Sequence, residues 1–204
     1  MDFKTLADQY RNELLDNVLP FWLEHSQDLE FGGYFTCLDR KGGVFDTDKF
    51  IWLQGREVWM FSMLYNKVEK RQEWLDCAVQ GGEFLKKYGH NGDYNWYFSL
   101  NRSGRPLVEP YNIFSYTFAT MAFGQLSLAT GSQEYADIAK KTFEIILSKV
   151  DNPKGKWNKL HPDTRNLKNF ALPMILCNLA LEIEHLLDPG YLEQTMETCI
   201  HEVM

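Results

Sequence analysis

The chain has 204 residues, 45% hydrophobic and 15% aromatic, enough to bury the core of one large domain. Its net charge of -7 offers no basic footprint for nucleic acid, and no stretch approaches the ~20 apolar residues of a membrane-spanning helix. The four cysteines show no CxxC spacing, and the N-terminal residues do not resemble a secretory signal, which favours reduced thiols. We therefore expect a soluble cytoplasmic protein with reduced thiols that binds neither nucleic acid nor membranes.

The N-terminal region predicts a helix followed by a hairpin. Apolar residues keep helical spacing from Thr5 to Glu24, and Pro20 predicts a bend. Beyond Gly32-Gly33, residues 34–46 alternate around the turn signal Lys41-Gly42-Gly43, which is typical of a short β-hairpin.

The hairpin motif is repeated along the chain. The segment beginning Tyr34-Phe35 returns at Tyr97-Phe98, 62 to 63 positions later, and the flanking residues match as well. Each copy predicts an apolar inner helix and then an amphipathic outer helix, the first capped by Asp46-Thr47-Asp48. The predicted inner helices run to about residue 65, over 111–129 and over 168–187, and the outer ones over 71–88, 132–150 and 190–204.

Alternation of inner and outer helices is typical of an all-α fold, the α/α toroid. A repeat of this size must stack on its neighbours to bury its apolar face. Three inner helices form only an arc, so we expect another copy of the chain or a C-terminal half to close it.

Arg56 is the most informative single residue, because the helix around it is apolar and offers a guanidinium almost no partner. Trp52 and Trp59 lie on the same helical face, and a cation beside an aromatic floor suits a polyhydroxylated ligand such as a sugar. The alternative is a structural ion pair with Glu57 or with an acid from a neighbouring helix.

Other polar groups fall on inner helices and in one loop. Tyr111 and Asn112 begin the second inner helix, while Met174 and Asn178 lie on the third. All four could line the same cavity, but Asn112 could equally cap its helix and Met174 fill the core.

The stretch with Lys154, Lys156 and Lys159 could hold a phosphate, although it lacks the P-loop pattern, and a solvated basic loop explains it as well. The histidines show no metal-ligand spacing, so we assign no metal. Carboxylates are nearly absent from the inner helices, which weakens a glycoside hydrolase interpretation.

Four motifs carry a family resemblance: residues 32–40 (GGYFTCLDR), 49–56 (KFIWLQGR), 111–115 (YNIFS) and 173–179 (PMILCNL). In these motifs, and in order over the whole chain, the sequence resembles the N-acylglucosamine 2-epimerase family. The resemblance implies a barrel of six α/α hairpins that interconverts N-acetylglucosamine and N-acetylmannosamine. The reaction removes and returns the C2 proton of the opened sugar and requires no cofactor.

The resemblance also implies roles for the residues singled out above. Arg56 would be important for activity, with Trp52, Met174 and Asn178 as substrate-binding residues. Tyr111 and Asn112 join the predicted substrate-binding residues because of their place at the start of the second inner helix. ATP would act as an allosteric activator, bound by Lys154, Lys156 and Lys159.

One departure from the family concerns length. Family members run to nearly twice 204 residues, and the histidines that serve as their general base and acid lie in the part that residues 1–204 do not match. We therefore expect the N-terminal half of an epimerase domain, inactive alone. The alternative is a non-catalytic sugar- or protein-binding module that forms a homodimer, and a glycoside hydrolase on a similar barrel ranks third.

Overall fold

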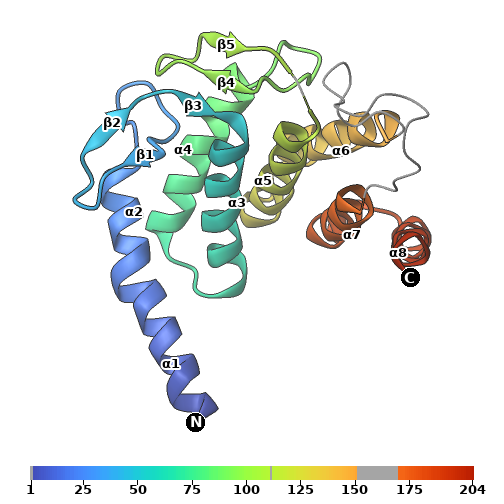
Figure 1. The fold of residues 1–204 in the computed structure, drawn as a ribbon, viewed down its shortest axis with the longest axis horizontal. Helices are drawn as coiled ribbons and strands as arrows, with labels where there is room; N and C mark the ends of the chain where they lie inside the picture. Colours follow the sequence, from blue (N-terminus) through green and yellow to red (C-terminus); the bar gives the residue numbers. More distant parts are fainter. Residues whose placement is uncertain (1, 111, 151–169) are drawn as a thin grey trace.

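A computed structural model describes residues 2–110, 112–150 and 170–204. The chain is a curved array of helices with short strands gathered at one end (Figure 1). The helices are α1 Phe3–Glu13, α2 Leu19–His25, α3 Ile51–Lys67, α4 Gln72–Tyr88, α5 Phe114–Thr130, α6 Gln133–Ser148, α7 Ala171–Glu182 and α8 Pro189–Val203. The strands are β1 Cys37–Leu38, β2 Val44–Asp46, β3 Lys49–Phe50, β4 Ser99–Leu100 and β5 Pro106–Val108.

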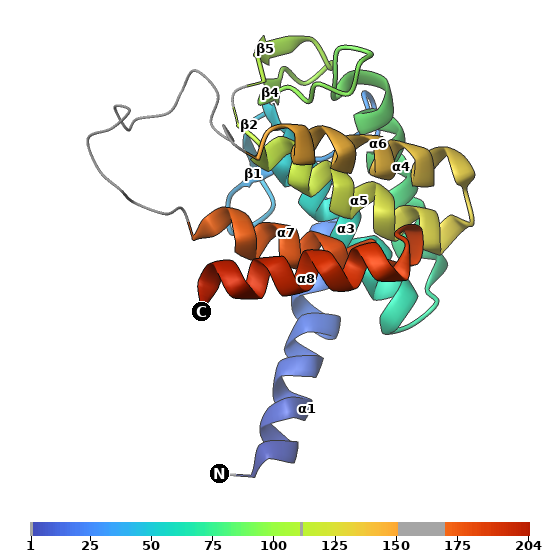
Figure 2. The ribbon, with the colours of Figure 1, turned by 90° about the vertical axis from the view of Figure 1, so that its right-hand side faces the viewer.

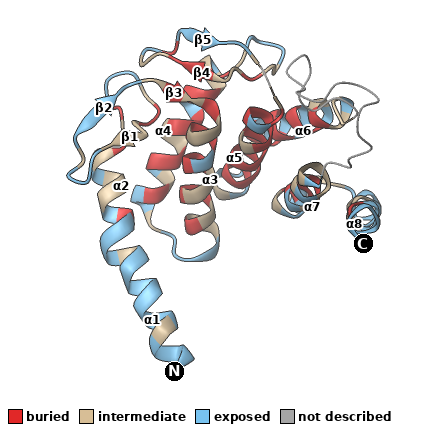
Figure 3. Cartoon of the chain, in the orientation of Figure 1, coloured by how far each residue is buried: buried red, intermediate tan, exposed pale blue. Residues whose placement is uncertain are grey.

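The predicted layers are present. α3 and α5 pack side by side as inner helices, with α4 and α6 outside them and α7 next to α5. Buried residues concentrate on α3, α5 and the inward faces of α4 and α6, whereas α7 and α8 bury few (Figure 3). Among the described residues these helices form an arc and close no barrel (Figure 1). No helix in this part of the chain is long and apolar enough to cross a membrane.

The N-terminal helix is interrupted just before the proline. A π-helical turn, Leu14–Val18, joins α1 to α2, and Pro20 lies in the first turn of α2. Proline lacks an N–H and its ring crowds the carbonyl four residues earlier, so the helix widens there. α1 has no buried residue and projects from the rest of the molecule (Figure 2).

The two hairpins are structural copies of each other. In the first, Cys37 pairs with Asp46 and Leu38 with Val44, and the second repeats this register with all numbers raised by 62. Both turns end on a glycine with positive φ, Gly42 at 83° and Gly104 at 90°. The sequence repeat is thus a repeat of backbone geometry.

The predicted cap of the first inner helix is wrong. α3 begins at Ile51, because Lys49 and Phe50 are drawn into strand β3, which pairs with β4. Asp46 belongs to β2, and its carboxylate accepts the N–H of Asp48 instead of a helical N–H. The third inner helix is also shorter than predicted, since α7 ends at Glu182 and a 3₁₀ turn, Glu184–Leu186, follows.

A buried ion cluster joins the first repeat to the second. The Asp28 carboxylate accepts hydrogen bonds from Lys49 Nζ and Arg102 Nε, each 2.9 Å long, and Arg102 Nη2 adds another at 3.0 Å. The side chains of Asp28 and Lys49 are fully buried. Burial alone would raise the pKa of Asp28, but the bonds from Arg102 and Lys49 outweigh it and lower that pKa to about 2.

Candidate active site

Arg56 lies in the second turn of α3, and its side chain is directed toward α5. Its guanidinium carbon stands 5.5 Å from the centre of the Phe118 ring, a cation–π distance. The side chain is exposed, and none of the ion pairs found among the described residues includes it. The guanidinium therefore packs over an aromatic ring, and no hydrogen bond from its donors is found within residues 2–110, 112–150 and 170–204.

A cavity of about 270 Å³ opens beside this pair, at the strand-bearing end of α3 and α5. Four of its lining residues are aromatic and two are polar: Trp52, Phe98, Phe114, Phe118, Asn112 and Ser115. Trp52 and Phe118 face each other with ring centroids 5.9 Å apart. An apolar cleft with a few placed polar groups is the usual form of a small-molecule site.

Asn112 lies just before α5 and bonds to the backbone there. Its Oδ1 accepts the N–H of Phe114 at 2.9 Å, so it satisfies a free donor at the start of α5. The same residue lines the cavity with Trp52. Asn112 is nevertheless not the N-cap considered from the sequence, because that position is held by Ile113, which makes no side-chain cap bond. A role of Asn112 in substrate binding stays a prediction.

Arg56 is not itself among the residues that line this cavity, but it contacts Phe118, which is. Of the described residues predicted for the site, Trp52 and Asn112 line the cavity and the others do not. Met174 and Asn178 are exposed on α7, where they line a separate groove against α8. Asn178 still contacts the wall of α5, because its amide nitrogen lies 4.0 Å from Met121 Sδ. Tyr111 and the lysines Lys154, Lys156 and Lys159 lie outside the described residues.

Comparison with known proteins identifies the family. The family model described as N-acylglucosamine 2-epimerase (GlcNAc 2-epimerase) matches residues 33–204. The chain belongs to the N-acylglucosamine 2-epimerase family. It is 41% identical over 174 residues to the bovine (Bos taurus) N-acylglucosamine 2-epimerase, an alignment that covers 83% of this chain and 41% of that protein.

Two further relatives define the family relation. The mouse (Mus musculus) N-acylglucosamine 2-epimerase is 38% identical over 198 residues, covering 93% of this chain and 47% of that protein. The solved structure of cellobiose 2-epimerase from Spirochaeta thermophila superposes with a TM-score of 0.79 at 19% identity, covering 97% of this chain and 53% of that one. The fold is thus that of the epimerase α/α toroids, and the chain spans about half the length of its relatives.

The contact between Arg56 and Phe118 was not predicted from the sequence, although the internal repeat of this family member relates the two positions. At the offset of 62 that relates the two hairpins, Phe118 occupies the position of Arg56 and Phe114 that of Trp52. Equivalent positions on adjacent inner helices face the same side of a stacked array. Listing the residues equivalent to Trp52 and Arg56 would have found two walls of the cavity.

A second polar contact ties the inner helices together farther along this face. Trp59, three residues after Arg56, donates its Nε1–H to Glu182 Oε2 at 2.9 Å, and Gln125 Nε2 reaches the same oxygen at 3.1 Å. These bonds join α3, α5 and α7. Because Glu182 is engaged with two donors, it orients the helices around the candidate site.

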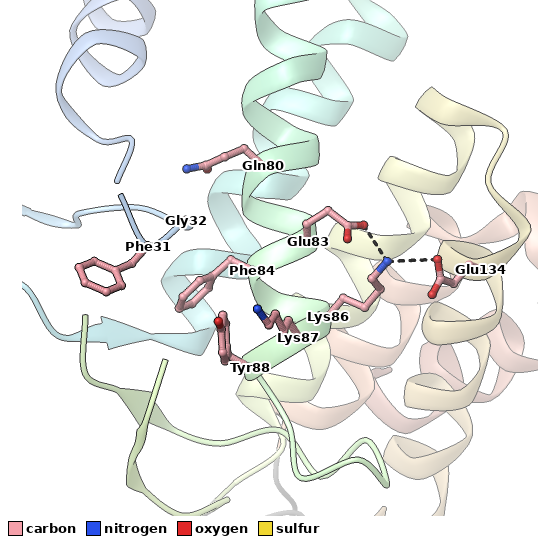
Figure 4. A pocket seen from close by; sticks show the side chains of 9 residues that line it. All are labelled: Phe31, Gly32, Gln80, Glu83, Phe84, Lys86, Lys87, Tyr88 and Glu134. Carbon is pink, nitrogen blue, oxygen red and sulfur yellow. Dashed lines mark hydrogen bonds and ion pairs between the residues drawn. The ribbon is translucent and has the colours of Figure 1, made fainter. Parts of the chain in front are cut away.

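A wider pocket of about 510 Å³ lies away from this site, on the outer side of α4 (Figure 4). Its charges largely satisfy one another, since Lys86 Nζ bonds to Glu83 at 2.9 Å and to Glu134 at 3.1 Å. None of the predicted site residues lines it. We therefore place the candidate site at Arg56.

The sequence alternative that paired Arg56 with Glu57 is wrong. Glu57 is buried, and its carboxyl group shares a hydrogen bond with the hydroxyl of Ser26, the C-cap residue of α2. The Ser26 hydroxyl also lies 2.6 Å from the Trp22 carbonyl, and its single proton can serve only one of these two acceptors. A protonated Glu57 resolves this, and burial raises the pKa of Glu57 to about 8.

Replacing Glu57 with glutamine should stabilise the protein at neutral and alkaline pH. The pKa of Glu57 is higher in the folded state than in the unfolded state, so stability is lost as pH rises from about 4.5 to 8. Glutamine keeps the hydrogen bond to Ser26 without a proton to lose. We expect Glu57→Gln to gain about 2–3 kcal/mol at pH 7 and little at pH 4, measured by urea unfolding. An equal gain at both pH values would contradict the protonation argument.

Proposed function

We propose that this chain forms part of a sugar 2-epimerase site that interconverts N-acetylglucosamine and N-acetylmannosamine. The observation that carries the proposal is the exposed guanidinium of Arg56, which lies over the ring of Phe118, a residue of the aromatic cavity. Membership of the family supplies the reaction type. The N-acylated sugars are favoured over cellobiose because identity is 41% to the bovine N-acylglucosamine epimerase and 27% to the cellobiose 2-epimerase of Dictyoglomus turgidum.

The arrangement suits the charge that develops during epimerisation. In the opened N-acetylated sugar, removal of the C2 proton next to the C1 aldehyde leaves an enolate with negative charge on the C1 oxygen, since C2 carries the acetamido nitrogen and no hydroxyl. Proton return on the opposite face inverts C2. A guanidinium fixed before the reaction stabilises that oxygen in the transition state, where a hydrated cation would have to reorganise. The rings of Trp52 and Phe118 would hold the apolar face of the sugar.

The base must come from elsewhere. Removing a carbon-bound proton requires a positioned base within hydrogen-bond reach. None of the residues that line the cavity carries a side chain that titrates near neutral pH. We infer that this chain binds the sugar and stabilises the charge, that a further part of the toroid supplies the base, and that the 204-residue chain alone does not turn the sugar over.

Exchange of the C2 proton with solvent tests this directly. N-acetylglucosamine is incubated in D₂O with the 204-residue chain, and deuterium at C2 is followed by proton NMR, with sugar binding measured by tryptophan fluorescence. We expect binding that quenches Trp52, no exchange above the buffer rate, and exchange once the remainder of a family polypeptide is present. Exchange by the chain alone would contradict the inference that the base comes from a further part of the toroid. Absence of exchange in the assembled toroid would contradict the epimerase proposal.

The alternative function is a non-catalytic sugar-binding module that dimerises. It is supported by the same cavity and by the uncovered apolar face of α7, where Met174 is 53% exposed. It predicts sugar binding by a stable dimer in light scattering and no C2 exchange under any combination of polypeptides. The exchange experiment therefore separates the two functions.

A further inference from the structure

Two phenylalanines extend the walls of the aromatic cavity beyond the pair formed by Trp52 and Phe118. Phe98 comes from the second hairpin, just before β4, and its ring packs edge-on against Phe50 with the centroids 5.8 Å apart. Phe114 is the first residue of α5. The cavity is therefore enclosed by side chains from two inner helices and a hairpin, so its shape is set by the packing of these elements.

Asn112 brings a hydrogen-bond donor to this cavity. Its Oδ1 accepts the N–H of Phe114 at 2.9 Å, which fixes the plane of the amide. Its Nδ2 carries two hydrogens, and no hydrogen bond from it is found in the described part of the chain. None of the described residues that line the cavity is charged. The cavity thus combines apolar walls with a positioned donor for a neutral acceptor such as a carbonyl oxygen.

An N-acyl group matches this combination better than the rest of the opened sugar. Carbons C3 to C6 each carry a hydroxyl, and burying hydroxyls against aromatic rings without partners costs free energy. The acetamido group ends in an apolar methyl and has one carbonyl acceptor. At about 30 Å³ for each heavy atom its volume is roughly 120 Å³, less than half of the cavity's 270 Å³.

The position of the cavity also suits an acyl group on C2. Arg56 lies 5.5 Å from the centre of the Phe118 ring, and the same ring lines the cavity. In the reaction proposed above, the C1 oxygen faces the guanidinium. Because the acyl nitrogen is attached to C2, the carbon next to C1, the acyl group can enter the cavity past Phe118 while C1 stays beside Arg56.

We propose that this cavity receives the N-acyl group and selects acylated sugars over sugars with a hydroxyl at C2. Phe98 and Phe114 contact the acyl methyl, and Asn112 Nδ2 donates to the acyl carbonyl. The inference rests on the proposed function for the position of C1, and it assigns substrate selection to residues that take no part in proton transfer. Because the cavity is larger than an acetyl group, it also admits longer acyl chains.

Binding of acyclic sugar alcohols tests this inference without turnover, because a C1 alcohol does not acidify the C2 proton as the aldehyde does. The probes are N-acetylglucosaminitol, its N-propanoyl and N-butanoyl analogues, and glucitol, which has a hydroxyl at C2. Their affinities for the 204-residue chain are measured by calorimetry. We expect N-acetylglucosaminitol to bind at least about tenfold more tightly than glucitol. Each added methylene should tighten binding by up to about fourfold.

Two substitutions separate the acyl carbonyl from the acyl chain. Asn112→Asp keeps an oxygen for the N–H of Phe114 but removes the donor, so the preference for N-acetylglucosaminitol over glucitol should fall at least about fivefold. Phe114→Ala removes one wall, so the gain from longer acyl chains should be lost. The control is Phe45→Ala, a 72% exposed phenylalanine of β2, which should change neither preference. Circular dichroism should show native helix content in all three variants.

The outcomes distinguish this inference from the epimerase proposal. Equal affinity for N-acetylglucosaminitol and glucitol, no measurable binding of either, or a preference that survives both substitutions would overturn the acyl cavity even if the assembled toroid exchanges the C2 proton. An acyl preference that depends on Asn112 and Phe114, without C2 exchange in any assembly, would support the acyl cavity and contradict only the reaction.

Discussion

Asp28→Asn should lower the free energy of unfolding by about 3–5 kcal/mol, the cost of removing one member of a buried ion pair. Asparagine fills the same space and still accepts hydrogen bonds. It leaves the ammonium of Lys49 without a counterion in a fully buried position, where the remaining acceptors are the backbone carbonyls of Gly32 and Arg102. Urea unfolding at pH 7 measures the loss.

The pH dependence distinguishes loss of the ion pair from loss of packing. Burial lowers the pKa of Lys49 even with Asp28 present, and without that carboxylate it falls further. The folded state then loses the proton at a lower pH than the unfolded state, so stability should rise with pH until Lys49 is neutral in both. A loss that is the same at pH 7 and pH 10 would contradict the charge argument.

Asp39→Asn is the matched control for this substitution. Asp39 accepts the N–H groups of Lys41 and Gly43 in the exposed turn of the first hairpin. In the second hairpin Asn101 occupies the equivalent position and accepts the N–H of Arg105 in the same way. Because the protein already uses asparagine at the equivalent position of the second hairpin, the change should leave the free energy of unfolding nearly unchanged.

Local and repeated features of the fold could be predicted from the sequence. Hydrophobic periodicity found the helices, and turn chemistry found both hairpins, since Gly42 and Gly104 stand where positive φ is required. The internal sequence repeat then predicted the inner and outer helix layers, because repeats at one offset stack on each other through equivalent contacts. Gly131, also at positive φ, is the C-cap residue of α5.

Contacts between distant residues could not be predicted in this way. Asp28 and Arg102 are separated by 74 positions, and nothing in either local sequence marks them as partners. Strand β3 likewise depends on β4, which is why the cap at Asp46-Thr47-Asp48 was predicted wrongly. The partner of Glu57 could not be predicted for the same reason, because Ser26 lies at the end of a different helix.

The Arg56 prediction combines both kinds of information. Arg56 was found from its apolar surroundings in the sequence, whereas its contact with Phe118 was found only from the structure.

Arg56→Ala should reduce kcat/KM for N-acetylglucosamine by roughly 10²–10³-fold in the assembled toroid, the usual loss when one preorganised group at a developing oxyanion is removed. In the 204-residue chain alone it should weaken sugar binding.

Arg56→Lys and Phe118→Leu separate charge from orientation. Lysine keeps the positive charge but not the planar group that stacks on the ring of Phe118, and leucine removes the ring while Arg56 keeps its charge. Both should lower kcat more than they raise KM, because the ground-state sugar depends less on the direction of the cation than the enolate does. Arg105→Ala, an exposed arginine in the second hairpin turn, is the control for loss of charge. If Arg56→Lys retained full activity, positive charge alone would account for the role of Arg56, and its placement over Phe118 would be irrelevant to the reaction.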